Sequence, residues 1–163
     1  MYRNRGRNFM NSQHTEELSS IFAGALSEVI VKTTGFSIFI MPLDYETSLD
    51  EMTGFMNLNG KNQGLIFITA GVETMRLISS YMTGTKKEDI TKSDMEDALG
   101  EIVNMTAGFA KLRFGYMEQS YTLSPPFVIQ GNNMSITTKK RINIISRVLK
   151  NSDIMLKIKL IFY

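Results

Sequence analysis

The chain has 163 residues, of which 43% are hydrophobic and 21% are charged, and its formal net charge at pH 7 is +2. This composition is typical of one globular domain with a sizeable core, and so small a net charge does not argue for nucleic-acid binding. The absence of cysteine excludes disulfides and thiolate chemistry and fits a cytoplasmic protein. The longest apolar runs, such as 36–43 and 65–72, are far shorter than the ~20 residues that a membrane-spanning helix needs.

Residues 1–13 contain three arginines and no apolar run, so we expect a disordered basic tail rather than a signal peptide. Residues 14–163 are expected to form a single domain. A helix is predicted to begin at Thr15, which two glutamates follow, and to extend to about Thr34. Residues at three- and four-residue spacing give this helix one buried face: Leu18, Phe22, Leu26, Val29, Ile30 and Thr33.

Residues 36–92 are predicted to form three strands, a short helix and a loop. Segment 36–43 is dense in Ile and Phe and is predicted to be a strand that ends around Pro42. Segments 52–58 and 65–69 are predicted to be two more strands, joined as a hairpin through an Asn-Gly pair. A short helix is predicted over 71–82, and a polar loop then leads to the next helix.

Segment 93–115 is predicted to be a second long helix, with Ser93 as its N-cap and Glu96 completing a capping box. Its buried stripe is predicted to consist of Met95, Leu99, Ile102, Val103, Thr106, Phe109 and Ala110. At about 100° per residue the opposite stripe consists of Asp97, Glu101, Asn104 and Gly108. We call these last four residues the polar column, because they are expected to point away from the core in one line.

The composition of the polar column is unusual for a face that only meets solvent. Asn and Gly are poor residues in a helix interior, where Gly costs about 1 kcal/mol relative to Ala. An exposed position under no other demand more often holds Ala, Lys or Gln. Gly108 also leaves a notch, one turn beyond Asn104, that another molecule could approach. The alternative is an ordinary solvated helix face, and on this segment alone that alternative is favoured.

An internal repeat changes this balance. Segment 25–36, ALSEVIVKTTGF, matches segment 98–109, ALGEIVNMTAGF, at six of twelve positions. Shared amphipathic patterning explains the apolar matches but not the Thr-x-Gly-Phe of both copies, so a duplication is the better interpretation. The first copy has Val31 in place of Asn104 and a glycine in place of Asp97. Only the second copy therefore keeps the full polar column.

The C-terminal part is predicted to be β-structure. Segments 121–123 and 127–129 are expected to be extended on either side of a Pro-Pro pair, and 142–149 and 154–162 to pair as a hairpin around 151–153. The basic residues here are Lys139, Lys140, Arg141, Arg147, Lys150, Lys157 and Lys159. We interpret them as a solvated sheet face, the alternative being a docking surface for an acidic partner. Together the elements predict an α+β fold: a mostly antiparallel sheet of six or seven strands, two long pseudo-two-fold-related helices and one short helix.

The polar column is the candidate for chemistry. It has no His or Cys and too few close carboxylates for a metal site, and the chain lacks a Ser–His–Asp set, a glycine-rich phosphate loop and a Rossmann fingerprint. A carboxamide both donates and accepts hydrogen bonds, so it can aim a water molecule, as amides do in phosphoryl-transfer hydrolases. A carboxylate one turn away can pair with a cation of a partner. Such a helix would complete an active site that lies mostly on another protein.

The spacing of Asp97, Glu101 and Asn104 within DALGEIVNMTAG resembles the CheC/CheX/FliY family of bacterial chemotaxis phosphatases. The resemblance includes the Pro-Pro pair about twenty residues later, the following FVIQG and the preceding NGKNQGLIFITAGVETMRLISSYMTG, and covers about residues 15–162. With one intact active helix instead of two, the chain is more similar to CheX. The gap from Asn104 to the prolines is slightly shorter than is usual in the family.

The resemblance implies hydrolysis of the aspartyl phosphate of the response regulator CheY. Asn104 would orient the attacking water, and Glu101 would pair with the active-site lysine of CheY. Asp97 and Gly108 would help to bind this partner. The resemblance also implies that Mg²⁺ belongs to the partner, that this chain has no cofactor of its own, and that it forms a homodimer in the cytoplasm.

Two other functions stay open. A non-catalytic CheX-like module could bind a response regulator or a flagellar component through the same helix face, and it would not need Asn104. A nucleic-acid or membrane-surface binder could use the basic tail and the C-terminal strands, but the low net charge and the lack of clustered exposed aromatics disfavour it.

Overall fold

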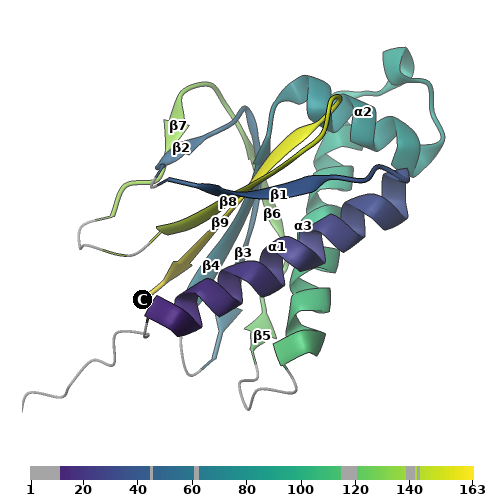
Figure 1. The fold of residues 1–163 in the computed structure, drawn as a ribbon. Helices are drawn as coiled ribbons and strands as arrows, with labels where there is room; N and C mark the ends of the chain where they lie inside the picture. Colours follow the sequence, from purple (N-terminus) through teal and green to yellow (C-terminus); the bar gives the residue numbers. More distant parts are fainter. Residues whose placement is uncertain (1–11, 45, 61–62, 115–120, 139–141, 143) are drawn as a thin grey trace, which may run out of the picture.

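The computed structural model describes residues 12–44, 46–60, 63–114, 121–138, 142 and 144–163. These residues form helices α1 (Ser12–Thr34), α2 (Val72–Thr83) and α3 (Lys92–Phe114), and a 3₁₀ turn at Lys87–Asp89. The strands are β1 (Phe39–Leu43), β2 (Ser48–Leu49), β3 (Met52–Asn59), β4 (Gly64–Ala70), β5 (Thr122–Leu123), β6 (Phe127–Gln130), β7 (Met134–Ser135), β8 (Ile144–Lys150) and β9 (Met155–Phe162). The predicted α+β class, with two long helices and a short one, is confirmed (Figure 1). The predicted basic tail lies, up to residue 11, outside the described residues.

Seven strands form one sheet in the order β1-β8-β9-β4-β3-β5, and β6 also pairs with β3; every pairing is antiparallel. Both predicted hairpins, β3–β4 and β8–β9, are present. The second is turned by Asn151, whose Oδ1 accepts hydrogen bonds from the backbone N–H groups of Asp153 and Ile154 at 2.8 and 3.0 Å. Strand β1 lies at a sheet edge, where a strand tolerates a proline such as Pro42.

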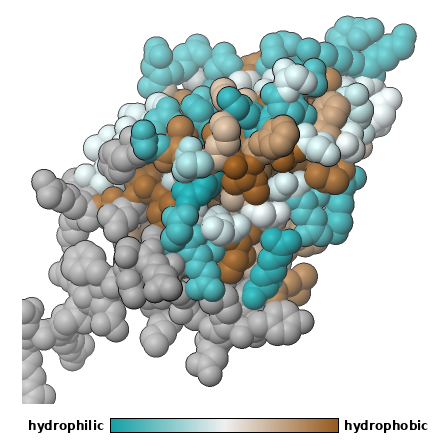
Figure 2. All heavy atoms as spheres, viewed as in Figure 1, coloured by the Kyte–Doolittle hydropathy of each residue, from teal (hydrophilic) through white to brown (hydrophobic). Residues whose placement is uncertain are grey.

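Helices α1 and α3 pack against each other and against one face of the sheet (Figure 1). Helix α1 begins three residues before its predicted start. The predicted stripes face the core: Leu18, Phe22, Leu26, Val29 and Ile30 of α1 and Met95, Leu99, Ile102, Val103, Thr106 and Ala110 of α3 are buried, and Thr33 and Phe109 are partly buried. Each buried Leu, Ile or Val contributes about 1.5–3 kcal/mol. The outer surface that α1 crosses mixes polar and apolar side chains (Figure 2).

The N-terminal cap of α3 differs from the predicted pair of Ser93 and Glu96. The backbone N–H of Thr91 donates to Oδ2 of Asp94 at 2.8 Å, and the N–H of Asp94 donates to Oγ1 of Thr91 at 3.2 Å. The capping box therefore lies two residues earlier, and the hydrogen bonds from Thr91 lower the pKa of Asp94. Two overlapping patterns, Thr-x-x-Asp and Ser-x-x-Glu, compete in this sequence, and only the helix start at Lys92 decides between them.

Candidate functional site

The polar column lies on the outer side of α3, opposite its buried stripe. The buried stripe fixes the rotation of the helix, so the opposite stripe has to face outwards. Asp97, Glu101 and Asn104 are exposed. Gly108 is half-buried, and apart from its chain neighbours and the nearby backbone of its own helix, nothing lies within 4 Å of the place that a Cβ on it would occupy. The structure thus leaves open the notch expected beyond the amide.

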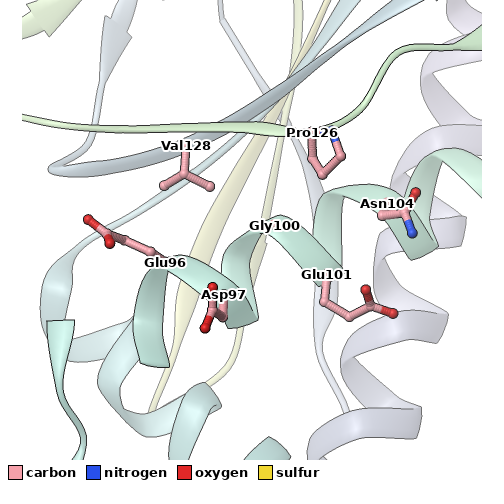
Figure 3. Close-up of a pocket in the computed structure, with 7 residues that line it drawn as sticks. All are labelled: Glu96, Asp97, Gly100, Glu101, Asn104, Pro126 and Val128. Carbon is pink, nitrogen blue, oxygen red and sulfur yellow. The ribbon is translucent and has the colours of Figure 1, made fainter. Parts of the chain in front are cut away.

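Three members of the column line a pocket of about 500 Å³ between α3 and the segment formed by Pro126 and the start of β6 (Figure 3). The residues of this column pocket are Glu96, Asp97, Gly100, Glu101, Asn104, Pro126 and Val128. One wall is polar and comes from α3, and the other is apolar and comes from Pro126 and Val128. Gly108 is not among the lining residues. The pocket brings the amide, the carboxylates and the proline segment together, as one site requires.

Three lining residues were missed by the sequence analysis. Glu96 was assigned to the helix cap, but it lines the pocket, and its Oε1 lies 3.6 Å from Nζ of Lys92. Gly100 lies one turn before Asn104, so its helical spacing was the signal that could have placed it in the column. Val128 had no comparable signal, because its position depends on the pairing of β6 with β3.

The side chains of the column are free for a partner. Within the described ranges, no hydrogen bond or ion pair of a side chain involves Asp97, Glu101 or Asn104. The nearby cation Lys92 meets Glu96 only at an exposed, 3.6 Å contact, and exposed pairs of this kind contribute little to stability. The site therefore offers unneutralised carboxylates beside a free amide.

These groups limit the chemistry. An amide can hold a water molecule through one donated and one accepted hydrogen bond, but it cannot itself act as a strong base or nucleophile. Among the described residues, no group of three or more His, Cys, Asp or Glu side chains is arranged to hold a metal ion. In the same part of the chain, no helix combines the length and the apolar character that crossing a bilayer needs. The site fits the positioning of water and the docking of a cation.

The equivalent face of α1 has other contacts. Glu28 lies 2.7 Å from Nζ of Lys32 and 2.7 Å from Nη2 of Arg113, which comes from α3. Val31, at the position of Asn104, has 44% of its surface exposed. The exposure of Val31 could not be predicted from the sequence, because it depends on what packs against this end of α1.

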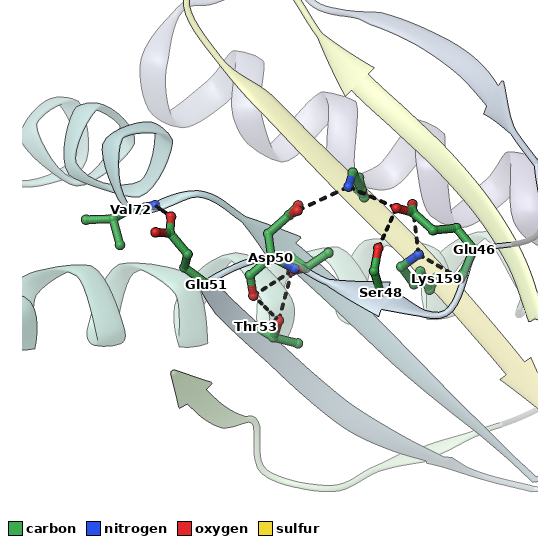
Figure 4. Close-up of polar contacts among 9 residues, drawn as sticks. Glu46, Ser48, Asp50, Glu51, Thr53, Val72 and Lys159 are labelled. Atoms are coloured by element: carbon green, nitrogen blue, oxygen red, sulfur yellow. Dashed lines mark hydrogen bonds and ion pairs between the residues drawn. The ribbon is translucent and has the colours of Figure 1, made fainter. Parts of the chain in front are cut away.

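The interpretation of the C-terminal lysines as a solvated face is wrong for Lys157 and Lys159. Lys159 is fully buried on the sheet face opposite the helices, where its Nζ donates to the backbone O of Glu46 at 2.9 Å and meets Oε2 at 3.3 Å (Figure 4). Lys157 is bound by Oδ1 of Asp50 at 3.1 Å and by Oε1 of Glu46 at 3.4 Å. Burial lowers the pKa of Lys159. These two lysines stabilise the fold and are not available for an acidic partner; residues 139–141 lie outside the described residues.

The same charged network joins the segment before β3 to this face of the sheet. Residues around β2 lie over the sheet, and β2 pairs with β7 in a two-stranded ribbon. Beneath it a second, smaller core contains Leu49, Phe67, Ile144 and Ile161. The column pocket therefore lies on the helix side of the molecule, and the charged network on the other side.

Comparison with known proteins identifies a family. Residues 52–149 match the family model described as chemotaxis phosphatase CheX, and this range includes all of α3, Pro126 and Val128. No curated protein matches the chain. The family match thus rests on the part of the sequence that builds the column pocket.

Solved structures share the fold. A chemotaxis protein CheX from Desulfovibrio desulfuricans is 20% identical with a TM-score of 0.78, covering 90% of this chain and 99% of that one. A chain of the crystallised CheX–CheY–BeF₃–Mg²⁺ complex from Borrelia burgdorferi is 16% identical with a TM-score of 0.71, covering 89% of this chain and 97% of that one. FliY from Thermotoga maritima is 15% identical with a TM-score of 0.65, covering 94% and 91%. At these identities the likeness concerns the fold.

Proposed function

Because the chain belongs to the family of chemotaxis phosphatases named CheX, we propose that it hydrolyses the aspartyl phosphate of a CheY-type response regulator. The observation that carries the proposal is the exposed, unpaired amide of Asn104, one helical turn from the exposed carboxylate of Glu101, in one pocket. The crystallised complex of a CheX with CheY, BeF₃ and Mg²⁺, which shares this fold, supports a response regulator as the partner.

In this proposal the chain supplies geometry and the partner supplies the phosphorylated carboxylate. The carboxamide of Asn104 holds a water molecule in line with the phosphorus–oxygen bond to the aspartyl group. The water oxygen bonds to phosphorus as that bond breaks, so inorganic phosphate leaves and the partner's carboxylate is restored. Mg²⁺ belongs to the partner and stabilises the charge on the phosphoryl oxygens. Glu101 pairs with a lysine of the partner and fixes the register between the two proteins.

The remaining residues have binding roles in the proposal. Asp97, at the N-terminal end of the column, adds a second carboxylate toward a basic partner surface. Gly108 leaves space for the partner's backbone. The proposal also keeps a single domain over 14–163 with a basic tail before it, a homodimer, a cytoplasmic location and no cofactor held by this chain.

A direct assay tests the function. A CheY-type response regulator is phosphorylated with acetyl phosphate, and the decay of its phosphoryl group is followed with and without this protein. We expect faster decay with the wild-type chain and a loss of about 100-fold or more in this rate for Asn104→Ala, because one contact of the transition state is removed. The affinity for the regulator should change much less.

Val31→Ala is the matched control, since it truncates the equivalent position of α1, and its rate should equal that of the wild type. If the wild-type chain binds the regulator and leaves its lifetime unchanged, the protein is the non-catalytic CheX-like module instead. A loss of rate with Val31→Ala and not with Asn104→Ala would place the site on the wrong helix.

A further inference from the structure

Gly54 of β3 lies where the two walls of the column pocket meet. It is buried, and in the sheet it stands opposite Val128 of β6 on one side and Ile68 of β4 on the other. Val128 lines the apolar wall of the pocket, so the backbone of Gly54 supports that wall directly. The other wall, α3, packs over the same position.

There is no room for a side chain between Gly54 and α3. A Cβ at this position would lie 2.6 Å from Cγ2 of Val103 and 3.1 Å from Cγ of Leu99. Carbon atoms in contact are normally about 3.5–4.0 Å apart, so a methyl group here would force Val103 and Leu99, and with them the turn of α3 that carries them, to move by about 1 Å. Among the described residues the glycines with positive φ are Gly35 and Gly84, so position 54 needs glycine for space and not for backbone conformation.

Leu99 and Val103, the two residues nearest to Gly54, belong to α3, which forms the polar wall of the pocket. Leu99 directly precedes Gly100, and Val103 directly precedes Asn104, so any displacement of the buried stripe also displaces the amide. The two walls are already close, since a Cβ on Gly100 would lie 3.9 Å from Cγ2 of Val128. Figure 3 shows Pro126 and Val128 above this turn of the helix.

We propose that Gly54 is a positioning residue that sets the distance between α3 and β6, and with it the position of the Asn104 amide relative to the apolar wall. This inference rests on the proposed function, because it concerns the geometry in which the amide meets the partner's phosphoryl group. Reactions of precisely held groups are sensitive to such shifts: a misplacement of about 1 Å can cost about 100-fold in rate.

Gly54→Ala tests the inference in the dephosphorylation assay, with the response regulator phosphorylated by acetyl phosphate. We expect kcat to fall about 10- to 100-fold, because a partner docked on α3 would meet the wall of Pro126 and Val128 at a changed distance from the amide. KM should change much less, because the docking carboxylates move together with the helix that carries them. A folded Gly54→Ala with the kcat of the wild type, or with a loss confined to KM, contradicts the inference.

Gly64→Ala is the control for general damage to the sheet. A Cβ at position 64 would lie 2.7 Å from the backbone O of Ile161, so this change overcrowds β4 and β9 instead of α3. We expect it to lower the melting temperature without lowering kcat. If Gly64→Ala lowers kcat as much as Gly54→Ala does, loss of stability explains the effect and the inference is wrong.

Rescue provides the second test. Val103→Ala removes Cγ2, the atom closest to a Cβ at position 54, so Gly54→Ala/Val103→Ala should have about the kcat of Val103→Ala alone. This pair of variants decides the question even if Gly54→Ala alone does not fold. A folded double variant that is much slower than Val103→Ala overturns the inference.

An NMR measurement separates this inference from the proposed function. The side-chain amide signals of Asn104 can be followed in the free protein; they should shift in Gly54→Ala and return toward the Val103→Ala values in the double variant. If the wild-type chain does not accelerate dephosphorylation, the proposed function is wrong, and these signals still test the geometry. Unshifted signals in a folded Gly54→Ala would refute the positioning role whatever the activity.

Discussion

Helices α1 and α3 have the same length and related sequences, yet they offer different chemistry to solvent. Each has 23 residues, and segments 25–36 and 98–109 match at six of twelve positions. Glu28 of α1 occupies the position that Glu101 has in α3. The two carboxylates therefore allow a comparison within one molecule between an ordinary surface and a candidate site.

Glu28 is bound within its own chain and Glu101 is not. The hydrogen bond from Lys32, together with the positive charges of Lys32 and Arg113, lowers the pKa of Glu28. Lys32 also lies over the ring of Phe109, 4.5 Å from its centroid, so this cation is held between the two helices. In the described part of the chain, Glu101 has no cation of this kind.

The difference shows that a repeated pattern does not repeat its function. In α1 the carboxylate already has two cations, and Val31 in place of the amide cannot hold a water molecule. In α3 both groups are free, and β6 adds an apolar wall beside them. The two helix faces therefore differ in two ways: in the cations beside each carboxylate, and in having Val31 or Asn104 at the equivalent position.

Exchanging Asn104 of α3 and Val31 of α1 should change the dephosphorylation rate more than any other test of the two helices. Asn104→Val gives α3 the side chain of α1, and we expect the dephosphorylation rate to fall about 100-fold or more because the water loses its guide. Val31→Asn gives α1 the missing amide, and the rate should stay at the wild-type value because Glu28 remains paired.

The same assay and a binding measurement check both variants. A rate in Val31→Asn/Asn104→Val close to that of the wild type would mean that α1 can form a working site, and the assigned roles of the neighbours would then be wrong. Circular dichroism should show the same helix content in all of these variants, since both positions are exposed.

The polar column could be predicted from the sequence because helical periodicity is local. Residues three and four apart share a face whatever packs against the helix, so the exposed positions of Glu101 and Asn104 followed from the buried stripe alone. The column pocket was only partly predictable. The Pro-Pro pair marked its second segment, but Val128 reaches α3 through strand pairing, which no local pattern contains.

The burial of Lys159 had no local signal either. Its partner Glu46 is 113 residues away in the sequence. A strand with alternating basic residues is predicted to face solvent, because nothing in the strand itself indicates that another segment covers it. The covering segment includes β2, and β2 and β7 have two residues each, too few for a periodicity of two to be recognised. These failures share one cause, which is contact between distant parts of the chain.

Glu46, like Glu28, is a carboxylate that is bound by cations of its own chain, and Glu46→Ala tests its role. It leaves the buried Lys159 with the backbone O of residue 46 alone, so we expect the free energy of unfolding to fall by about 2 kcal/mol. Urea unfolding measures this loss. The dephosphorylation rate at 25 °C should not change, because the network lies on the face opposite the helices.

Lys159→Met is the matched rescue, since an apolar side chain of similar length removes the unpaired charge. Stability should recover in Glu46→Ala/Lys159→Met. A folded Glu46→Ala that loses activity without losing stability would show that this face of the sheet is coupled to the column pocket.

Glu101→Gln and Glu28→Gln compare the two carboxylates directly. If Glu101 pairs with a lysine of the partner, its neutral isostere should raise the Kd for the response regulator about tenfold, the scale of one charge-assisted hydrogen bond. Titration calorimetry with the beryllofluoride-activated regulator gives this value. Glu28→Gln should leave the Kd unchanged, because its charge is already neutralised. Equal effects of the two changes would remove the distinction between the helices.

Arg113→Gln should have the smallest effect, because it removes one of two exposed cations from Glu28 and leaves the column intact. The pKa of Glu28 is lowered in the folded state, so these ion pairs stabilise the protein fully above the unfolded value of 4.5, and this contribution is lost as the pH falls through the lower folded value. Urea unfolding should therefore show a small deficit of Arg113→Gln at pH 7 that disappears in acid and in high salt. A deficit that grows toward acidic pH would mean that Arg113 stabilises the helix pair by some contact other than Glu28. The dephosphorylation rate depends on Glu101 and not on Glu28, so it should equal that of the wild type at every pH where both proteins are folded.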